Sequence, residues 1–334
     1  MLKDLEFSDI ILLLDGLAYL KGTPGSGQHL VPIPDELKSE VNDLLDHVKE
    51  QFKGKDKGAS PRIKHMTLFF RAAAFEDVNF GSAFFMRRLA DSVPNLPMIG
   101  YSTPMVNWLT NREQCNKGLL LFSGGQGAGK TTSAASFIQE RLRLYGGHAV
   151  SFENPVEMPL AGAHGDFGRC FQTEIESEAE LAYHIERAHR YSSPNIIYIG
   201  EIRSKYAASE SLRVALGSKQ QLVVATIHGL SIITALNRLL TWAVELDGKI
   251  AYQNLAQTLV GIIHQELVDE EEKEGIRDGK VPQRTLQVPE YMFVPFHDNA
   301  KHIRSLLADG NLDKLKDEIR SQRNRAAFSG SIEL

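Results

Sequence analysis

Residues 124–132 read Gly124-Gly125-Gln126-Gly127-Ala128-Gly129-Lys130-Thr131-Thr132 and fit the pattern G-x-x-x-x-G-K-[ST]. The apolar run Leu119-Leu120-Leu121-Phe122 directly before this motif predicts a buried strand. Apolar residues at helical spacing follow the motif, and a glycine pair ends the helix: Ala134, Phe137, Ile138 and Leu142, then Gly146-Gly147. The motif is therefore expected on a strand-to-helix turn, which is the setting of a phosphate-binding loop (P-loop).

Each part of this motif has a chemical role in holding a nucleotide phosphate. Glycines let the backbone bend tightly and turn its N–H groups toward phosphate oxygens, and the helix N-terminus adds partial positive charge. Lys130 is expected to bridge the β- and γ-phosphates of ATP, and the Thr131 hydroxyl is expected to ligate Mg²⁺. The expected nucleotide-binding residues are Gly124, Gly127, Ala128, Gly129, Lys130, Thr131 and Thr132.

The composition is that of a globular protein with two domains. The chain has 334 residues, of which 43% are hydrophobic and 24% charged, and its formal net charge is -5. This charge argues against a broad electrostatic grip on nucleic acid, so no direct nucleic-acid partner is expected. Asp9 and Asp15 bracket the apolar residues 10–14, and we therefore expect no membrane span, no signal peptide and a cytoplasmic location. Cys115 and Cys170 lie far apart and are expected to be free thiols.

Residues 1–95 are expected to form a small α/β domain. Its predicted elements are β-like runs at 10–13 and 66–70 and a helix at 35–51. Three prolines disfavour helical geometry around residues 94–105, and these are Pro94, Pro97 and Pro104. We therefore place an interdomain linker at 96–110 and a second domain at 111–334.

Strands and helices alternate from Gly118 onward. Strands are predicted at 119–122, 148–152, 196–199 and 222–226, and helices at 130–145, 178–191, 205–216 and 231–244. This order predicts a mainly parallel sheet with helices on both faces. Ligands on such sheets bind at the carboxyl ends of the strands, which is where the remaining candidate residues fall.

Carboxylates and a histidine follow three of these strands. After the second strand, Glu153 and Glu157 are both candidates to orient and deprotonate an attacking water. Glu201 follows the apolar run at 196–199 and is placed to support Mg²⁺. His228 follows the strand at 222–226 and could sense the γ-phosphate, although a histidine at a strand end is more often structural.

Four segments, in order, resemble the motifs of the secretion and pilus family of hexameric ATPases, and most closely PilT-like type IV pilus retraction ATPases. They are the P-loop at 124–132, an aspartate box at 152–157, an atypical Walker B motif at 194–203 and a histidine box at 226–228. This resemblance to the GspE-like superfamily implies a small PAS-like α/β N-terminal domain followed by a RecA-like P-loop NTPase domain. It also implies that Glu157, rather than Glu153, is the catalytic glutamate and that Glu201 supports Mg²⁺.

The first domain and the C-terminal region carry further likenesses to this family. Segments at 70–75 and 85–89 resemble those whose arginines reach the ATP of a neighbouring subunit, which makes Arg71 and Arg87 the arginine-finger candidates. A guanidinium supplied in trans requires a closed ring, so the resemblance implies a homohexamer. Residues 302–307 resemble a box involved in working movement, and its apolar members fit a helix core equally well.

Four positions depart from the family pattern. Asn154, Ser204, Gln221 and Gly229 stand where the family has an aspartate, an acid, a histidine and a threonine. The residues expected to carry the chemistry all remain, namely Lys130, Thr131, Glu157, Glu201 and His228. A working ATPase that is slow or specialised is therefore the expectation.

The leading interpretation is an ATP-hydrolysing hexameric motor that powers type IV pilus retraction, pilus dynamics or secretion. Such a ring would be cytoplasmic and peripherally associated with an inner-membrane pilus or secretion platform protein. A conjugative or type IV secretion system ATPase is an alternative that the sequence leaves open. Alternatives from other classes are a RecA-like motor acting on nucleic acid and a nucleotide-binding adaptor that no longer hydrolyses ATP.

Overall fold

The computed structural model describes residues 1–26, 29–55, 58, 60–79, 81–177, 180–217, 221–269, 284–296 and 300–329. The chain divides into two compact units, one containing Met1–Asp91 and the other containing Ser92–Val268 and Arg284–Leu334. Within the described ranges, no helix is both long enough and apolar enough to cross a bilayer. Cys115 and Cys170 are free, as expected. Both are buried, and burial raises the pKa of each thiol to about 12.

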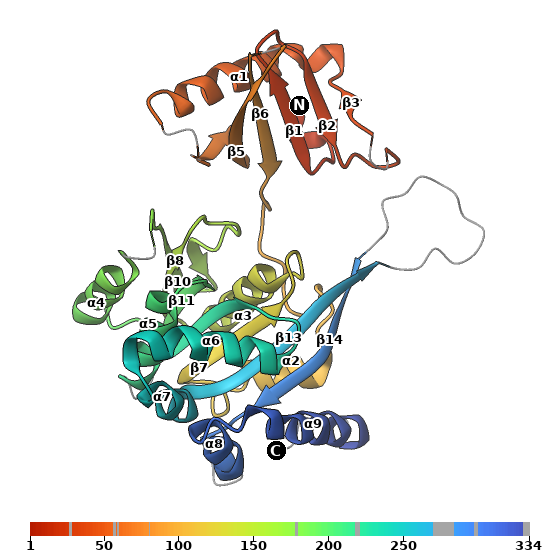
Figure 1. Cartoon of the computed structure of the whole chain (residues 1–334). Coiled ribbons are helices and arrows are strands. Elements are labelled where there is room, and N and C mark those ends of the chain that lie inside the picture. Colours follow the sequence, from red (N-terminus) through yellow and green to blue (C-terminus); the bar gives the residue numbers. More distant parts are fainter. Residues whose placement is uncertain are drawn as a thin grey trace. The chain divides into compact units, whose positions relative to one another are not determined.

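The N-terminal unit is a sheet packed against one long helix (Figure 1). Its strands follow the order β3-β2-β1-β6-β5-β4. They are β1 (Asp9–Leu13), β2 (Ala18–Lys21), β3 (Val31–Pro32), β4 (Arg62–His65), β5 (Leu68–Asp77) and β6 (Gly81–Arg88). The helices are the short 3-10 turns at Leu2–Asp4 and Asp35–Leu37 and the helix α1 (Lys38–Phe52).

Alternation along the strands fixes which face of this sheet is buried. In α1, the buried residues are Val41, Leu44, Leu45 and Val48. They share a core with strand residues such as Ile10, Phe70 and Met86. The predicted helix at 35–51 is confirmed, but the predicted run at 66–70 is partly wrong. Met66 is exposed at a φ of 53° in the turn between β4 and β5, so its apolar side chain does not mark a strand.

The second unit is built on an eight-stranded sheet of order β14-β13-β7-β12-β11-β8-β10-β9. Strands β13, β7, β12, β11, β8 and β10 pair in parallel along this order, and β9 pairs antiparallel with β10. The strands are β7 (Gly118–Gly124), β8 (Gly147–Glu153), β9 (Gly162–His164), β10 (Gly168–Glu174), β11 (Ile196–Ile202), β12 (Leu222–His228), β13 (Leu259–Asp269) and β14 (Arg284–Phe293). The mainly parallel sheet predicted from the alternation is confirmed.

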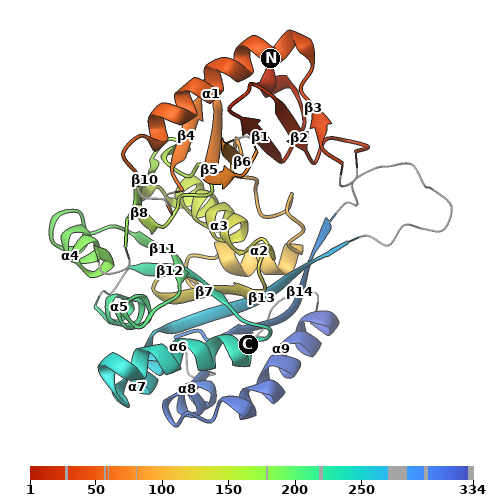
Figure 2. The same cartoon turned by 45° about the horizontal axis from the view of Figure 1, so that its top comes forward.

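Helices cover both faces of this sheet, as Figures 1 and 2 show. They are α2 (Thr103–Thr110), α3 (Lys130–Tyr145), α4 (Leu181–Tyr191), α5 (Lys205–Leu216), α6 (Ile232–Asp247), α7 (Ile250–Thr258), α8 (Lys301–Ala308), a 3-10 turn (Leu312–Lys314) and α9 (Leu315–Ser329). The first two residues of the helix predicted at 178–191, residues 178 and 179, lie outside the described residues.

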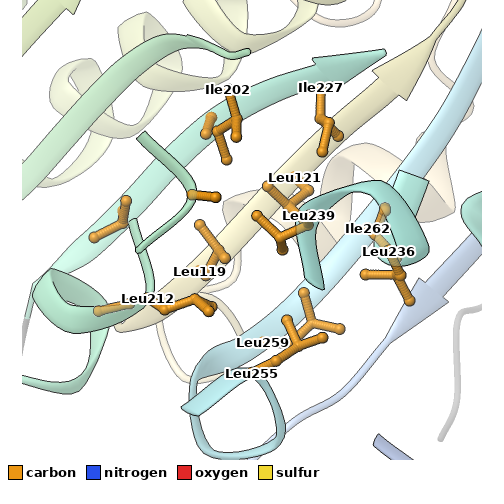
Figure 3. Packing of buried hydrophobic residues seen from close by; sticks show 14 of the residues in the cluster. Leu119, Leu121, Ile202, Leu212, Ile227, Leu236, Leu239, Leu255, Leu259 and Ile262 are labelled. Carbon is orange, nitrogen blue, oxygen red and sulfur yellow. The ribbon is translucent and has the colours of Figure 1, made fainter. Parts of the chain in front are cut away.

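Strand β7 shows why helices must pack on both faces of this sheet. Its side chains alternate between faces, so Leu119 and Leu121 pack with α5, α6 and α7 (Figure 3). The intervening Leu120 and Phe122 pack with α2 and α3 in a second core. An apolar residue at every position is what a strand buried on both faces requires.

The segment predicted as a linker contains a helix. Residues 103–110 form α2, in which Met105, Trp108 and Leu109 are buried. The Trp108 ring stacks on Phe293 of β14, with ring centroids 3.6 Å apart. Pro104 lies in the first turn of α2, where a missing N–H leaves no hydrogen bond unmade. The linker interpretation is therefore wrong for residues 103–110, because proline begins this helix instead of breaking it.

Candidate functional site

The P-loop lies at the turn between β7 and α3. Strand β7 ends at Gly124 and α3 begins at Lys130. Gly127 and Gly129 have φ values of 72° and 78°, in the left-handed region that favours glycine. A Cβ on Gly124 would lie 2.4 Å from the Gln265 carbonyl oxygen, so a side chain does not fit there. The loop thus has the tight backbone that a phosphate cradle requires.

Lys130 is buried, and two neighbours hold its ammonium group in place. Its Nζ donates to the Gly125 carbonyl oxygen at 2.7 Å and lies 3.3 Å from His228 Nδ1. Burial lowers the pKa of Lys130, whereas the charges of Glu201 and Glu157 act to raise it. Among the described residues, no carboxylate forms an ion pair with this ammonium. Its charge is therefore available to a phosphate group.

A β-bulge places Glu201 beside His228. The pairing of β11 with β12 shifts between Ile199 and Ile202, so Gly200 and Glu201 together stand opposite one residue of β12. A bulge of this kind re-aims a side chain. The Glu201 Oε1 atom lies 2.7 Å from His228 Nε2, and the other ring nitrogen of His228 faces Lys130. Lys130, His228 and Glu201 therefore form one continuous polar chain.

Glu153 and Glu157 differ in the way that matters for catalysis. Glu153 is 2% exposed, and its Oε1 accepts hydrogen bonds from Ser151 at 2.7 Å and Gln172 at 2.8 Å. A Cβ on Gly200 would lie 2.9 Å from the Glu153 side chain, which explains why glycine precedes Glu201. Glu157 is exposed and acts electrostatically on Lys130. Of the two carboxylates, Glu157 is therefore the one accessible to water and substrate.

Arg203 joins the segment that carries Glu157 to the strand that carries Glu201. One of its guanidinium nitrogens donates to the Asn154 carbonyl oxygen at 3.0 Å, and its Nε lies 3.6 Å from Glu201 Oε2. The Asn154 side chain donates to the Glu176 carbonyl oxygen at 3.0 Å. These contacts fix the loop after β8 against the end of β11.

The oxygen ligands at this edge of the sheet fit Mg²⁺. Thr131 lies half-buried in the first turn of α3, and Glu201 presents its carboxylate from β11. Within the described ranges, no group of three or more His, Cys, Asp or Glu residues could hold a metal alone. Mg²⁺ in phosphate sites takes one or two protein oxygens together with phosphate and water oxygens. Thr132, the next residue, places its hydroxyl 3.9 Å from the Met158 sulfur.

Arg71 and Arg87 lie in the N-terminal unit, on the face of its sheet opposite α1. They stand directly across from each other on β5 and β6, and Arg62 stands opposite Arg71. Arg87 Nε lies 3.2 Å from Asp9 Oδ1, and its side chain is 73% exposed. Arg71 Nε donates to the Ser60 hydroxyl at 3.2 Å. Like charges placed opposite each other destabilise a sheet, so this row suits an anionic partner.

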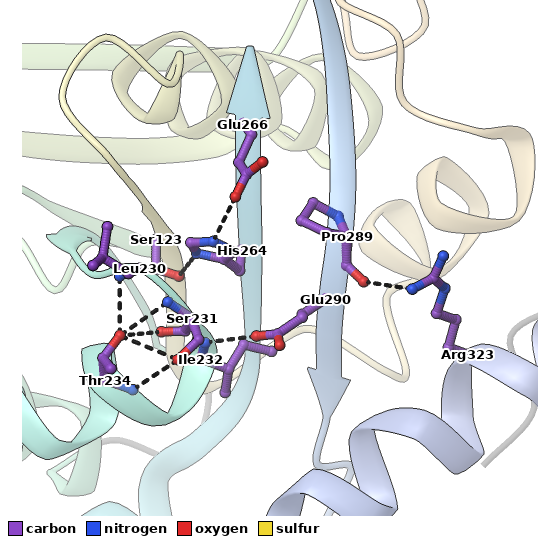
Figure 4. Close-up of polar contacts among 10 residues, drawn as sticks. All are labelled: Ser123, Leu230, Ser231, Ile232, Thr234, His264, Glu266, Pro289, Glu290 and Arg323. Carbon is purple, nitrogen blue, oxygen red and sulfur yellow. Dashed lines mark hydrogen bonds and ion pairs between the residues drawn. The ribbon is translucent and has the colours of Figure 1, made fainter. Parts of the chain in front are cut away.

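Two groups that contact the P-loop strand were missed from the sequence. Gln265, on β13, donates to the Ala128 carbonyl oxygen at 2.6 Å. Ser123 lies 3.1 Å from His264 Nδ1, and Glu266 lies 3.6 Å from the other nitrogen of that ring (Figure 4). The available signal was a pair of polar residues at the end of the apolar run 259–263, which is unusual in a buried strand.

Residues that differ from the family pattern have local roles in this structure. Ser204 caps α5 by accepting a hydrogen bond from the Ala207 N–H. Gln221 is buried and donates to the Pro194 carbonyl oxygen at 2.9 Å. Gly229 precedes α6, whose first turn is held by a capping box between Ser231 and Thr234 and by Glu290 (Figure 4).

Gly229→Ala is expected to lower the free energy of unfolding by about 1–3 kcal/mol, because an added methyl group would be overpacked. The new Cβ would lie 2.8 Å from the Ala235 Cβ and 3.0 Å from the Ala235 backbone nitrogen. Denaturant unfolding measures this loss. Gly58→Ala is the control, since nothing lies within 4 Å of a Cβ there. An unfolding free energy equal to that of Gly58→Ala would contradict the steric explanation for glycine at position 229.

The box at 302–307 forms most of α8. Its apolar members Ile303, Leu306 and Leu307 are buried, as the helix-core interpretation expects. Arg304 donates to the carbonyl oxygens of Val294 at 2.8 Å and Pro295 at 3.2 Å, and also to that of Ala256. In this structure, Arg304 therefore fastens α8 to the ends of β14 and α7.

Residues 47–299 match the family described as type II/IV secretion system protein. The chain is 32% identical over 178 residues to the competence protein ComGA of Halalkalibacterium halodurans, covering 53% of this chain and 46% of that protein. It is 28% identical over 211 residues to the type IV pilus ATPase PilU of Pseudomonas aeruginosa, covering 62% and 52%. The matches thus span about half the length of these curated relatives.

Two solved structures share the architecture along nearly the whole chain. The pilus retraction motor PilT with bound ADP has a TM-score of 0.67 at 21% identity, covering 96% of this chain and 87% of that one. The Legionella pneumophila ATPase DotB has a TM-score of 0.68 at 18% identity, covering 95% and 85%. These likenesses confirm the predicted fold, a small α/β domain followed by a RecA-like domain with a mostly parallel sheet. Because the family match covers most of the sequence, the chain belongs to the type II/IV secretion system protein family.

Proposed function

We propose that this chain is the subunit of a homohexameric motor that hydrolyses ATP. The observation that carries the proposal is the polar chain of Lys130, His228 and Glu201, with Glu157 in electrostatic reach of the same lysine. These residues come from separate segments and meet at the carboxyl ends of parallel strands. Phosphoryl transfer needs positioned charge more than covalent chemistry, and this edge of the sheet supplies it.

Each of these residues has a role in the proposed reaction. The P-loop N–H groups and Lys130 bind the β- and γ-phosphates of ATP. Thr131 and Glu201 would hold Mg²⁺, which neutralises charge on the phosphates when bound. Glu157 orients the attacking water and accepts its proton. His228 contacts both Lys130 and Glu201, so loss of the γ-phosphate changes the charge that its ring faces.

The work that this motor performs is proposed from its relatives. PilU is named as a type IV pilus ATPase and PilT as a pilus retraction motor, which favours pilus retraction, pilus dynamics or secretion. The partner would be an inner-membrane pilus or secretion platform protein, with the ring on its cytoplasmic side. A conjugative or type IV secretion system ATPase is the alternative, because the family that the chain matches is described as type II/IV secretion system protein. Co-purification with pilin-assembly or conjugation membrane proteins separates these two assignments.

Lys130→Ala is expected to weaken ATP binding by roughly 10- to 100-fold, the effect of losing one charge-assisted hydrogen bond. Isothermal titration with Mg²⁺ and ATP measures the loss. Lys205→Ala is the matched control, because Lys205 pairs with Glu245 on the surface of α5 and α6. Equal ATP affinity in the two variants would contradict the P-loop assignment and with it the proposed function.

A further inference from the structure

A buried glutamine on β13 forms a hydrogen bond with the backbone of the P-loop. Gln265 is fully buried, and its Nε2 donates to the Ala128 carbonyl oxygen at 2.6 Å. Its Oε1 accepts a hydrogen bond from the Tyr101 hydroxyl at 3.0 Å. Because Tyr101 donates and Ala128 accepts, the two ends of the amide are distinguished and its orientation is fixed. Tyr101 is itself 4% exposed, so the three groups form a closed network away from water.

The contact with Ala128 determines where the next N–H group points. In a planar trans peptide, the carbonyl oxygen of one residue and the N–H of the next point in opposite directions. Within the described residues, only the Asn154–Pro155 bond is cis, so the Ala128–Gly129 bond is trans. Holding the Ala128 oxygen toward β13 therefore turns the Gly129 N–H away from β13. Gly129 is the N-cap of α3, where N–H groups face a bound phosphate.

Gln265 also lies close to two glycines of the same loop. A Cβ on Gly124 would lie 2.4 Å from the Gln265 carbonyl oxygen, and one on Gly129 would lie 3.3 Å from the Gln265 Nε2. Gln265 therefore leaves little or no room for a side chain at the first and last glycines of the motif. These contacts leave the loop little freedom to rotate its peptide planes.

We infer that Gln265 is a positioning residue for nucleotide phosphate, and that Tyr101 orients its amide. Gln265 does not touch the nucleotide; it acts by aiming the Gly129 N–H. The inference rests on the proposed function, because it assumes that the P-loop binds ADP and ATP. Gln265 is therefore expected to affect only the share of the nucleotide affinity that comes from contacts between the P-loop and the β-phosphate.

Another buried glutamine provides a matched control. Gln322, on α9, is 1% exposed and exchanges two hydrogen bonds of 2.9 Å with the Phe293 backbone. Gln322 lies on a helix and not on β13, and it contacts β14 rather than the P-loop. Substitution of Gln322 therefore reproduces the structural cost of disturbing a buried amide without altering the peptide planes of the loop.

The test compares Gln265→Glu, Tyr101→Phe and Gln322→Glu in the full chain. Gln265→Glu keeps the shape of the side chain but replaces the donating Nε2 with a carboxylate oxygen, which cannot donate to the Ala128 carbonyl oxygen. This variant is expected to bind ADP about tenfold more weakly. Tyr101→Phe removes only the hydroxyl and is expected to weaken ADP binding about threefold. Displacement of a fluorescent ADP analogue measures affinities for ADP and for AMP, which lacks the β-phosphate. Affinity for AMP should stay the same.

The outcomes separate this inference from the proposed function. Weaker ADP binding in Gln265→Glu and Tyr101→Phe, with AMP binding unchanged and Gln322→Glu like the native chain, supports the inference. If Gln265→Glu does not fold, Tyr101→Phe alone decides. The inference is overturned if the folded Gln265→Glu and Tyr101→Phe variants bind ADP with native affinity. It is also overturned if they lose as much affinity for AMP as for ADP. Lys130→Ala in the same assay completes the test, since native ADP affinity there would remove the proposed function instead.

Discussion

Glu157→Gln is expected to lower steady-state ATP hydrolysis by about 10²- to 10⁴-fold, the contribution of a positioned general base, while ATP binding is retained. The amide keeps the size of the side chain but cannot accept the proton of the attacking water. Because Glu157 is exposed, the substitution leaves the buried core intact. Phosphate release and ATP titration on the same preparation measure the two effects separately.

Glu153→Gln is the matched control for this variant. The Glu153 carboxylate is buried, and the bonds from Ser151 and Gln172 both reach its Oε1, so an amide oxygen at that place keeps both. Turnover is expected to fall less than about tenfold, the loss of a neutral hydrogen bond. A large loss in Glu153→Gln with near-native turnover in Glu157→Gln would reverse the two roles. If the native ring binds ATP but releases no phosphate, the adaptor alternative becomes the leading one.

Local signals were enough to predict the P-loop and the strands around it. An apolar run, a glycine-rich turn and helical spacing are all contained within residues 119–142, and the structure shows β7 and α3 there. The residues predicted after the strand ends also meet, since carboxyl ends of parallel strands share one edge. Lys130, His228 and Glu201 illustrate this, because the strand order brings the ends of β7, β12 and β11 together, and the bulge in β11 then places Glu201 beside His228.

The features that were missed depend on contacts between distant segments. The bond between Gln265 and Ala128 joins residues 137 positions apart, and no local pattern indicates such a pair. Strand β10 was missed because it has few apolar residues: Cys170 is buried, Phe171 is exposed, and the other positions are glycine or polar. The Gly200 and Glu201 bulge is likewise a property of two paired strands and not of either sequence.

Arg87→Ala is expected to lower turnover by about 10³- to 10⁵-fold, the effect of losing an arginine finger, in rings whose size is unchanged. The arginine row on β4, β5 and β6 faces away from α1, and the Arg87 side chain is largely exposed. Among the described residues, Asp9 is the carboxylate that pairs with Arg87, at 3.2 Å, and most of the guanidinium stays exposed. Arg71→Ala tests the second candidate in the same assay, with ring mass in ATP measured by light scattering.

Mixing two inactive variants tests whether the arginine acts in trans. A subunit with Arg87→Ala keeps its own Glu157, and a subunit with Glu157→Gln keeps Arg87. If equal amounts assemble at random, about a quarter of the interfaces pair a subunit that keeps Glu157 with a neighbour that keeps Arg87. ATP hydrolysis should therefore reappear in the mixed rings. Lys130→Ala mixed with Glu157→Gln is the control, because each of these subunits lacks a residue of its own ATP site that the arginine of a neighbour cannot replace. Since a cis-acting or purely structural arginine cannot be replaced by a neighbour, absence of recovery in the first mixture would place the role of Arg87 within its own subunit.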